Sequence, residues 1–180
     1  MATLHHNISG ELAQELIPAG DNITVNKISL SNIQKVSNCK VDLYIEKKLT
    51  GRFYLIRNVN MPYGTTLILD NFTNFSTATG EFGLYIKLTD GDSFTLTGSI
   101  DPTGANTSVP GHNTLFLSEL STGDEIVVSG ETRTIAATTP ANPGVISDTS
   151  AVVTVAWGSD LANDTSPDCN PTALVDVIIN

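Results

Sequence analysis

The sequence predicts an all-β protein, specifically an antiparallel β-sandwich that carries an inserted small β-barrel or β-roll domain. Three observations predict this fold class. Only 16% of the 180 residues are charged, fewer than long surface helices need. Apolar residues recur at every second position in several short segments, which is the spacing of strands with one buried face. Turn residues such as Pro62 and Gly64 separate these segments.

The first half of the chain holds the clearest strands. In residues 40–47, Val41, Leu43 and Ile45 alternate with polar or aromatic residues, and residues 52–57 are expected to pair with this strand. Segment 11–17 fits a short helix or a strand equally well. A hairpin turn is expected at 90–92, and residues 59–64 are expected to form a turn. The remaining expected strands are 22–30, 65–70, 83–89 and 93–97.

The last ten residues contain one more strand, because Val175, Val177 and Ile179 recur at every second position. No module of their own follows them, so this strand is expected to return to the first module. The chain termini of a compact domain commonly lie close together. We therefore predict a β-sandwich docking domain of residues 1–95 plus 171–180. Residues 96–170 would be an acidic domain inserted into one of its hairpins.

Charge is distributed unevenly along the chain, in agreement with two modules. Residues 1–95 carry eight cationic and nine acidic side chains, whereas residues 96–180 carry only Arg133 against ten acidic side chains. The whole chain has 9 Lys and Arg against 19 Asp and Glu, a net charge of −10. Nucleic-acid binding is not expected, because each phosphate contact needs a cation that displaces counterions.

The inserted domain shows four further strand patterns and a hydrophobic core of its own. Gly130-Glu131 has the small-residue chemistry of a two-residue hairpin turn. Trp157, Phe116 and Ile126 are the expected core residues. The expected strands are 113–117, 125–129, 132–137 and 151–157, with a loop at 138–148.

The sequence contains no motif of a catalytic centre, so the protein is not expected to be an enzyme. It lacks the serine-nucleophile elbow, the phosphate-binding glycine loop with lysine, and the His-Glu-x-x-His and Cys-x-x-Cys pairs. His5 and His6 fit a solvated tail, and His112 fits a turn. Cys39 and Cys169 are compatible with a disulfide, but free, partly buried thiols are the favoured interpretation. No cofactor is expected.

One weak metal hypothesis concerns a run of oxygen-bearing residues near the end of the inserted domain. Asp160, Asn163, Asp164 and Asp168 offer the hard ligands that calcium prefers. A solvated acidic loop explains the same run without a ligand, and this interpretation is preferred, so no metal site is predicted.

Aromatic residues are the candidate contact residues. Tyr44, Tyr54 and Tyr85 fall on the opposite phase from the aliphatic residues of their strands, and Phe72 and Phe75 flank Asn74. Such rings could stack on sugars, which would make the protein a carbohydrate-binding module for host-surface glycans. They could equally be covered by a neighbouring subunit, because interfaces are enriched in Tyr and Phe. The second interpretation is favoured.

Most of the chain resembles small β-rich structural proteins of tailed bacteriophages. The resemblance lies in segments 7–30, 40–46 and 53–70, and in segment 120–137 with its Gly-Asp-x-Ile-x-Val-Ser-Gly-Glu-Thr-Arg core. It implies a non-enzymatic virion protein, a neck, tail or capsid accessory subunit, whose partners are other virion proteins and copies of itself. Such a protein is assembled in the host bacterial cytoplasm. The sequence shows neither a secretory signal nor an apolar run of membrane-spanning length, so membrane insertion is not expected.

Overall fold

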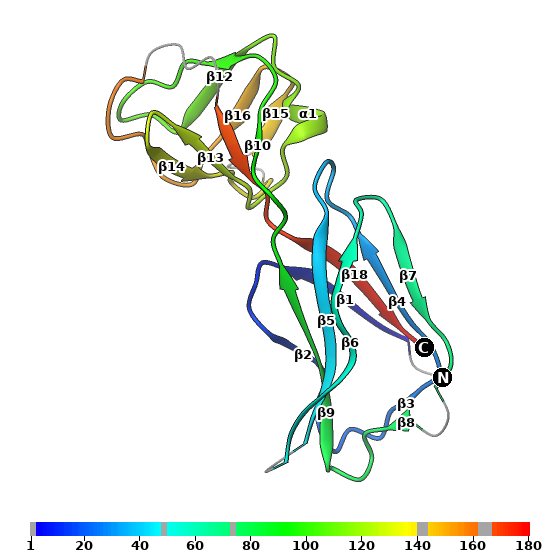
Figure 1. Cartoon of the computed structure of the whole chain (residues 1–180). Helices are drawn as coiled ribbons and strands as arrows, with labels where there is room; N and C mark the ends of the chain where they lie inside the picture. The colour runs from blue at the N-terminus through cyan, green and yellow to red at the C-terminus, as the bar shows by residue number, and fades with distance from the viewer. Residues whose placement is uncertain (1–2, 48–49, 73–74, 140–143, 162–166) are drawn as a thin grey trace. The chain divides into compact units, whose positions relative to one another are not determined.

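The computed structural model describes residues 3–47, 50–72, 75–139, 144–161 and 167–180 (Figure 1). The fold is all-β with antiparallel sheets, as the sequence predicts. The chain divides into two compact units. The first unit is Met1–Asp90 with Ala173–Asn180, and the second unit is Gly91–Thr172.

The first unit is sandwich-like and contains two four-stranded sheets. Sheet I has the order β1-β18-β4-β7, and sheet II has the order β2-β9-β5-β6. A short pair, β3 (Thr24–Val25) with β8 (Phe75–Ser76), accompanies them. The strands of sheet I are β1 (Leu4–Ser9), β18 (Leu174–Ile179), β4 (Ile28–Asn32) and β7 (Thr66–Leu69). Those of sheet II are β2 (Gln14–Ile17), β9 (Phe82–Thr89), β5 (Cys39–Lys47) and β6 (Gly51–Met61).

Alternating apolar residues of both sheets form the core of the first unit. Val41 and Leu43 of β5 are fully buried, and so are Leu84 and Ile86 of β9. On sheet I the same alternation buries Val175, Val177 and Ile179 of β18. One face of each sheet is therefore apolar, because successive side chains of a strand point to opposite faces. The two apolar faces pack together in one hydrophobic cluster.

The carboxyl-terminal strand belongs to the first unit. β18 lies between β1 and β4, with Val177 opposite His6 on one side and Leu30 on the other. Ala173 N donates to Asp90 Oδ1 at 2.7 Å, so the two residues that flank the second unit are bonded to each other. The chain therefore enters and leaves the second unit through two residues of the first unit that are hydrogen-bonded to each other. The second unit is inserted between β9 of sheet II and β18 of sheet I, and not within a hairpin.

The second unit has its own pair of four-stranded sheets around Trp157, Phe116 and Ile126, the core residues that the sequence predicts. No closed barrel is formed by the described residues, so of the two forms predicted for this domain, a barrel or a roll, the barrel is wrong. One sheet is β10 (Phe94–Thr95), β17 (Asp168–Asn170), β13 (Glu125–Val128) and β14 (Glu131–Thr134). The other is β11 (Ser99–Ile100), β12 (Ser108–His112), β16 (Ser150–Val152) and β15 (Val145–Ser147).

The boundary of the inserted unit differs from the predicted one. The hairpin expected at 90–92 is not formed. β9 pairs with β2 and β5, and not with residues 93–97. Phe94 and Thr95 instead pair with Cys169 and Asp168 in the second unit. The second unit therefore includes residues 91–95 and 171–172. Their strands pair with the other strands that cover the core of this unit.

Three local predictions change. Residues 113–117 do not form a strand, because helix α1 (Phe116–Glu119) begins there. The expected loop at 138–148 contains β15, and the expected turn at 59–64 starts only at Pro62, since β6 continues to Met61. Of the two alternatives for segment 11–17, the structure has the strand, β2, and no helix.

Both cysteines are free and buried. Burial, helped by the nearby Asp90 carboxylate, raises the pKa of the Cys39 thiol to about 11. Burial also raises the pKa of Cys169. Neither thiol is therefore an activated nucleophile at neutral pH.

Candidate functional site

Three of the predicted tyrosines form a row across the outer face of sheet II. Tyr44 of β5 lies directly opposite Tyr54 of β6 and Tyr85 of β9, which places all three side chains on the same side of the sheet. The ring centroids of Tyr44 and Tyr85 are 5.7 Å apart with nearly parallel planes, and those of Tyr44 and Tyr54 are 5.5 Å apart. The alternation of residues in the sequence therefore placed these three tyrosines correctly on one face of the sheet.

Tyr44 is not available as a contact residue. Only 1% of its surface is exposed, because its neighbours cover it and the Arg52 guanidinium lies 4.8 Å from its ring centre. Burial raises the pKa of its hydroxyl. Tyr54 is 40% exposed, although the Arg57 guanidinium lies 5.0 Å from its ring centre. The ring faces of these tyrosines mostly contact one another or an arginine of the same unit, which leaves little free ring face for a sugar.

Tyr85 is fixed by a hydrogen bond at the other end of the row. Its hydroxyl donates to Glu15 Oε1 of β2 at 2.6 Å. Ionisation of the Tyr85 hydroxyl would remove this bond and place the phenolate beside the Glu15 carboxylate. This bond, together with burial, therefore raises the pKa of Tyr85 to about 12. The bond stabilises the fold below pH 10, the ordinary pKa of tyrosine, and its contribution is lost as the pH rises toward 12.

Replacing Glu15 by glutamine is expected to lower the pKa of Tyr85 toward 10, since the neutral amide no longer repels the phenolate. Ultraviolet absorbance of the phenolate during an alkaline titration measures this pKa, and Tyr85→Phe identifies which titration belongs to this residue. A titration unchanged by Glu15→Gln would contradict the assigned cause.

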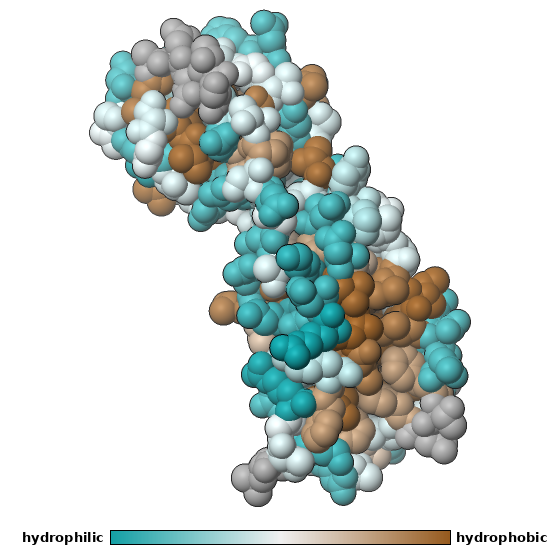
Figure 2. All heavy atoms as spheres, viewed as in Figure 1, coloured by the Kyte–Doolittle hydropathy of each residue, from teal (hydrophilic) through white to brown (hydrophobic). Residues whose placement is uncertain are grey.

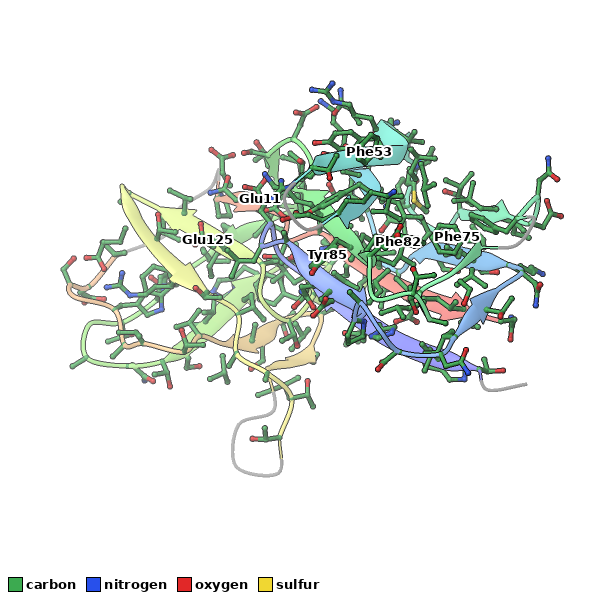
Figure 3. The ribbon with its side chains drawn as sticks, turned by 90° about the horizontal axis from the view of Figure 1, so that it is seen from below. Glu11, Phe53, Phe75, Phe82, Tyr85 and Glu125 are labelled. Atoms are coloured by element: carbon green, nitrogen blue, oxygen red, sulfur yellow. The ribbon has the colours of Figure 1, made fainter. Side chains whose placement is uncertain are left out.

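The two candidate phenylalanines take part in packing. Phe72 and Phe75 are half-buried against the core of the first unit, and their ring centroids are 5.4 Å apart. Phe75 also lies 5.4 Å from Phe82 of β9, and Figure 3 shows these two side chains next to each other. Asn74, which separates them in the sequence, lies outside the described residues. Phe75 is therefore a core residue and not a free contact residue, whereas Phe72 also reaches the surface described next.

An exposed apolar surface that the sequence analysis missed lies along β6 and β7. Phe53 and Leu55 of β6 are 47% and 37% exposed, and Ile68 of β7 is 50% exposed. A groove joins the two strands and is lined by Leu55, Ile68, Leu69, Asp70, Asn71 and Phe72. Figure 2 shows apolar residues gathered on this side of the first unit. We call Phe53, Leu55, Ile68 and this groove the edge face.

The edge face exists because two consecutive strands end the two sheets. β6 is the last strand of sheet II and β7 is the last strand of sheet I. The connection between them turns at Gly64, whose φ of 69° suits glycine. The buried Asn32 side chain holds this turn by donating to the Met61 carbonyl at 2.9 Å.

A bulge in β6 contributes to the exposure of Leu55. Tyr54 lies opposite Tyr44 and Ile56 lies opposite Leu43, so Leu55 has no residue opposite it on β5. A second irregularity follows at Asn58, which has a φ of 52° and whose N–H donates to Asp42 Oδ1 at 2.5 Å. Bulges bend and twist an edge strand. No pattern of alternating residues could have shown this irregular register.

The rim of the edge face carries charges of both signs. β6 contains Arg52 and Arg57 and no acidic residue. Arg52 forms an ion pair with Glu46 of β5, with Nε and Oε2 2.8 Å apart, whereas the Arg57 guanidinium packs on Tyr54. Asp70 lines the groove itself. The mixed charge of this rim agrees with the net charge of the first unit, which is close to zero.

A second groove on the first unit is polar. It lies over Gly83 and is lined by the carboxylates of Glu15, Glu46 and Glu81, with Lys47 3.7 Å from Glu81. Across the described part of the chain, no three His, Cys, Asp or Glu side chains are placed to hold a metal ion. Of the calcium candidates, Asn163 and Asp164 lie outside the described residues.

Comparison with known proteins identifies no relative: no family model, no curated protein and no solved structure matches this chain. Among the described residues, no helix is long and apolar enough to cross a membrane.

Proposed function

We propose that the protein is a non-catalytic structural subunit of a bacteriophage particle, and that it docks onto its partner through the edge face. The exposed apolar side chains on two adjacent edge strands carry this proposal. The setting, a neck, tail or capsid accessory position, is the one that the resemblance to phage structural proteins implies.

The exposed edge favours protein binding for a physical reason. An edge strand presents unpaired backbone N–H and C=O groups, and natural proteins usually cover or charge such edges. β6 is 11 residues long and places Phe53, Tyr54 and Leu55 at its surface. An aromatic and aliphatic surface of this kind gains free energy when a partner removes it from water.

The charges of the edge face are of both signs. Arg57 and the Arg52–Glu46 ion pair lie along β6, and Asp70 lines the groove. A partner surface that is apolar at its centre and carries charges of both signs at its rim would fit this face. Because these charges lie at the exposed rim, they are expected to affect the association rate and its salt dependence more than the final affinity.

The proposal predicts that Leu55→Asp prevents incorporation into particles. Aspartate would place a charge in the centre of the apolar contact, and central contacts dominate interface energies. The measurement supplies wild-type or variant chain to a phage that lacks its own copy and quantifies the chain in gradient-purified particles. Leu12→Asp is the matched control, because Leu12 is 81% exposed and precedes β2, at the opposite edge of sheet II.

Two outcomes would reject the proposal. Wild-type chain that never sediments with particles would reject the structural role, and equal incorporation of the Leu55→Asp and wild-type chains would reject the edge face. A glycan array then tests the remaining hypothesis of carbohydrate binding. Specific binding that is lost in Tyr85→Ala and retained in Leu55→Asp would favour it.

A further inference from the structure

A histidine lies between the two sheets where strand β1 ends sheet I. His6, which the sequence analysis expects in a solvated tail, belongs to β1. It lies between Leu4 and Ile8 in the alternation of this strand, and it is opposite the buried Val177 of β18. His6 therefore points to the core side of sheet I. β1 is at one end of sheet I and β2 is at one end of sheet II, so both are edge strands.

The His6 imidazole connects these two edge strands, but its hydrogen bonding is incomplete. The ring is hydrogen-bonded to the backbone of Leu16, a buried residue of β2. Its Nε2 atom is buried and has no hydrogen-bond partner among the described residues. Both ring nitrogens of a protonated histidine carry a proton, so protonation would leave a buried N–H donor without an acceptor.

The carboxylates on the neighbouring strands do not compensate a charge on His6. Glu15 of β2 accepts from the Tyr85 hydroxyl on the outer face of sheet II. Asp176 of β18 accepts from the Asn7 side chain on the outer face of sheet I. The titratable group that acts on His6 is His5, and a positive charge on His5 disfavours a second one on His6.

These surroundings determine how acid acts on β1. Burial lowers the pKa of His6 below its ordinary value of 6.5, and His5 lowers it further, whereas the hydrogen bond to the Leu16 backbone opposes this shift less strongly. A proton therefore binds His6 more tightly when β1 is detached than when it is attached. The attachment of β1 has its full stability above pH 6.5, and it loses stability as the pH falls through the lowered pKa.

From this placement we propose that β1 detaches from β18 in acid and that protonation of His6 causes the detachment. Detachment of this one edge strand returns the charged ring to water, while sheet II and the rest of sheet I stay intact. β1 pairs with all of β18, so its detachment uncovers the backbone of residues 174–179 as a new sheet edge. The inference does not depend on the proposed function, because β1 and the edge face lie at opposite ends of sheet I.

Hydrogen exchange of the full chain tests the proposal. It is measured by mass spectrometry at about pH 7.5 and about pH 5.5, one unit on either side of the ordinary histidine pKa. After correction for the intrinsic effect of pH on exchange, the amides of β1 are expected to lose protection at least about threefold at the lower pH. β4 and β7 are the internal reference, because they lie at the other end of the same sheet and are expected to keep their protection.

Two variants of β1 identify the titrating group. His6→Gln cannot take up a proton, and its amide can still donate to the Leu16 backbone, so β1 is expected to be equally protected at both pH values. His5→Gln is the matched control, because His5 is the preceding residue and is exposed. This control removes a histidine from the same strand but keeps His6, so it is expected to keep most of the acid response.

The contrary outcomes are as specific. Equal protection of wild-type β1 at both pH values, or an acid response that persists in His6→Gln, would overturn the proposal. A parallel loss of protection in β4 and β7 would also overturn it, because the whole unit would then be unfolding. If His6→Gln does not fold, a nuclear magnetic resonance titration of wild-type His6 decides, and a pKa of 6.5 or above would refute the role of this residue. None of these results bears on the edge face, which is tested by incorporation of Leu55→Asp into particles.

Discussion

Replacing Val177 by aspartate is expected to unfold the first unit, whereas the same replacement at the next residue, Ile178, is expected to leave it folded. Val177 is 1% exposed in the centre of β18, between β1 and β4. A carboxylate at this position would be buried among aliphatic side chains. His6 lies opposite on β1, but burial lowers the pKa of its imidazole, so it offers little compensating charge at neutral pH. The cost is expected to exceed about 4 kcal/mol, a large part of the stability of a small unit.

The control uses the alternation of the same strand. Ile178 is 38% exposed and points to the other face of sheet I, so Ile178→Asp keeps its charge in water. We expect a change within about 1 kcal/mol there, as for other surface substitutions. Urea unfolding followed by circular dichroism compares the two variants. Equal destabilisation by both would show that β18 does not present Val177 to a core, contrary to the structure.

The same alternation explains why much of the first unit could be predicted from the sequence. A strand with one buried face needs apolar residues at every second position, and β5, β9 and β18 all satisfy this requirement. Alternation shows that a strand has a buried face, but it does not identify the neighbouring strand. Residues 93–97 were therefore paired with β9 in the prediction, although Phe94 and Thr95 pair with β17 from the other end of the insertion.

Helix α1 shows a second limit of local sequence patterns. Residues 113–117 look like a short strand, but the backbone N–H groups of Phe116 and Leu117 bond to Asp148, which lies about thirty residues away in the chain. A long-range contact of this kind overrides a four-residue preference. Periodicity cannot decide such short segments, because one helical turn and a short strand each bury one or two residues.

The candidate site was predicted only in part, for reasons of sheet order and burial. The phase of Tyr44, Tyr54 and Tyr85 places them correctly on one face, but phase does not show that Arg52 and the other two rings cover Tyr44. The edge face depends on β6 and β7 being the last strands of their sheets. No residue of β6 identifies it as an edge, because edge position is a property of the whole strand order.

Replacing Asp124 by asparagine is expected to destabilise the second unit by about 2–4 kcal/mol, since hydrogen bonds to a buried charged group are strong and an unmatched buried donor is costly. Asp124 is 0% exposed. Its Oδ2 accepts from Ser121 N at 2.7 Å and its Oδ1 accepts from Thr172 N at 2.9 Å. An amide side chain offers only one oxygen, so its NH₂ group would face one of these two N–H donors.

Glu125 supplies the matched control for Asp124, because it is the next residue and is exposed. Glu125→Gln removes the same charge and is expected to change stability by less than about 0.5 kcal/mol. For a unit of this size, Asp124→Asn is expected to lower the melting temperature by about 10 °C or more. Differential scanning calorimetry of the full chain measures this melting temperature.

Asp124 links Ser121 to Thr172, the last residue of the second unit. If this link stabilises the second unit, only the melting temperature of that unit should decrease in Asp124→Asn. Equal shifts in Asp124→Asn and Glu125→Gln would contradict this role.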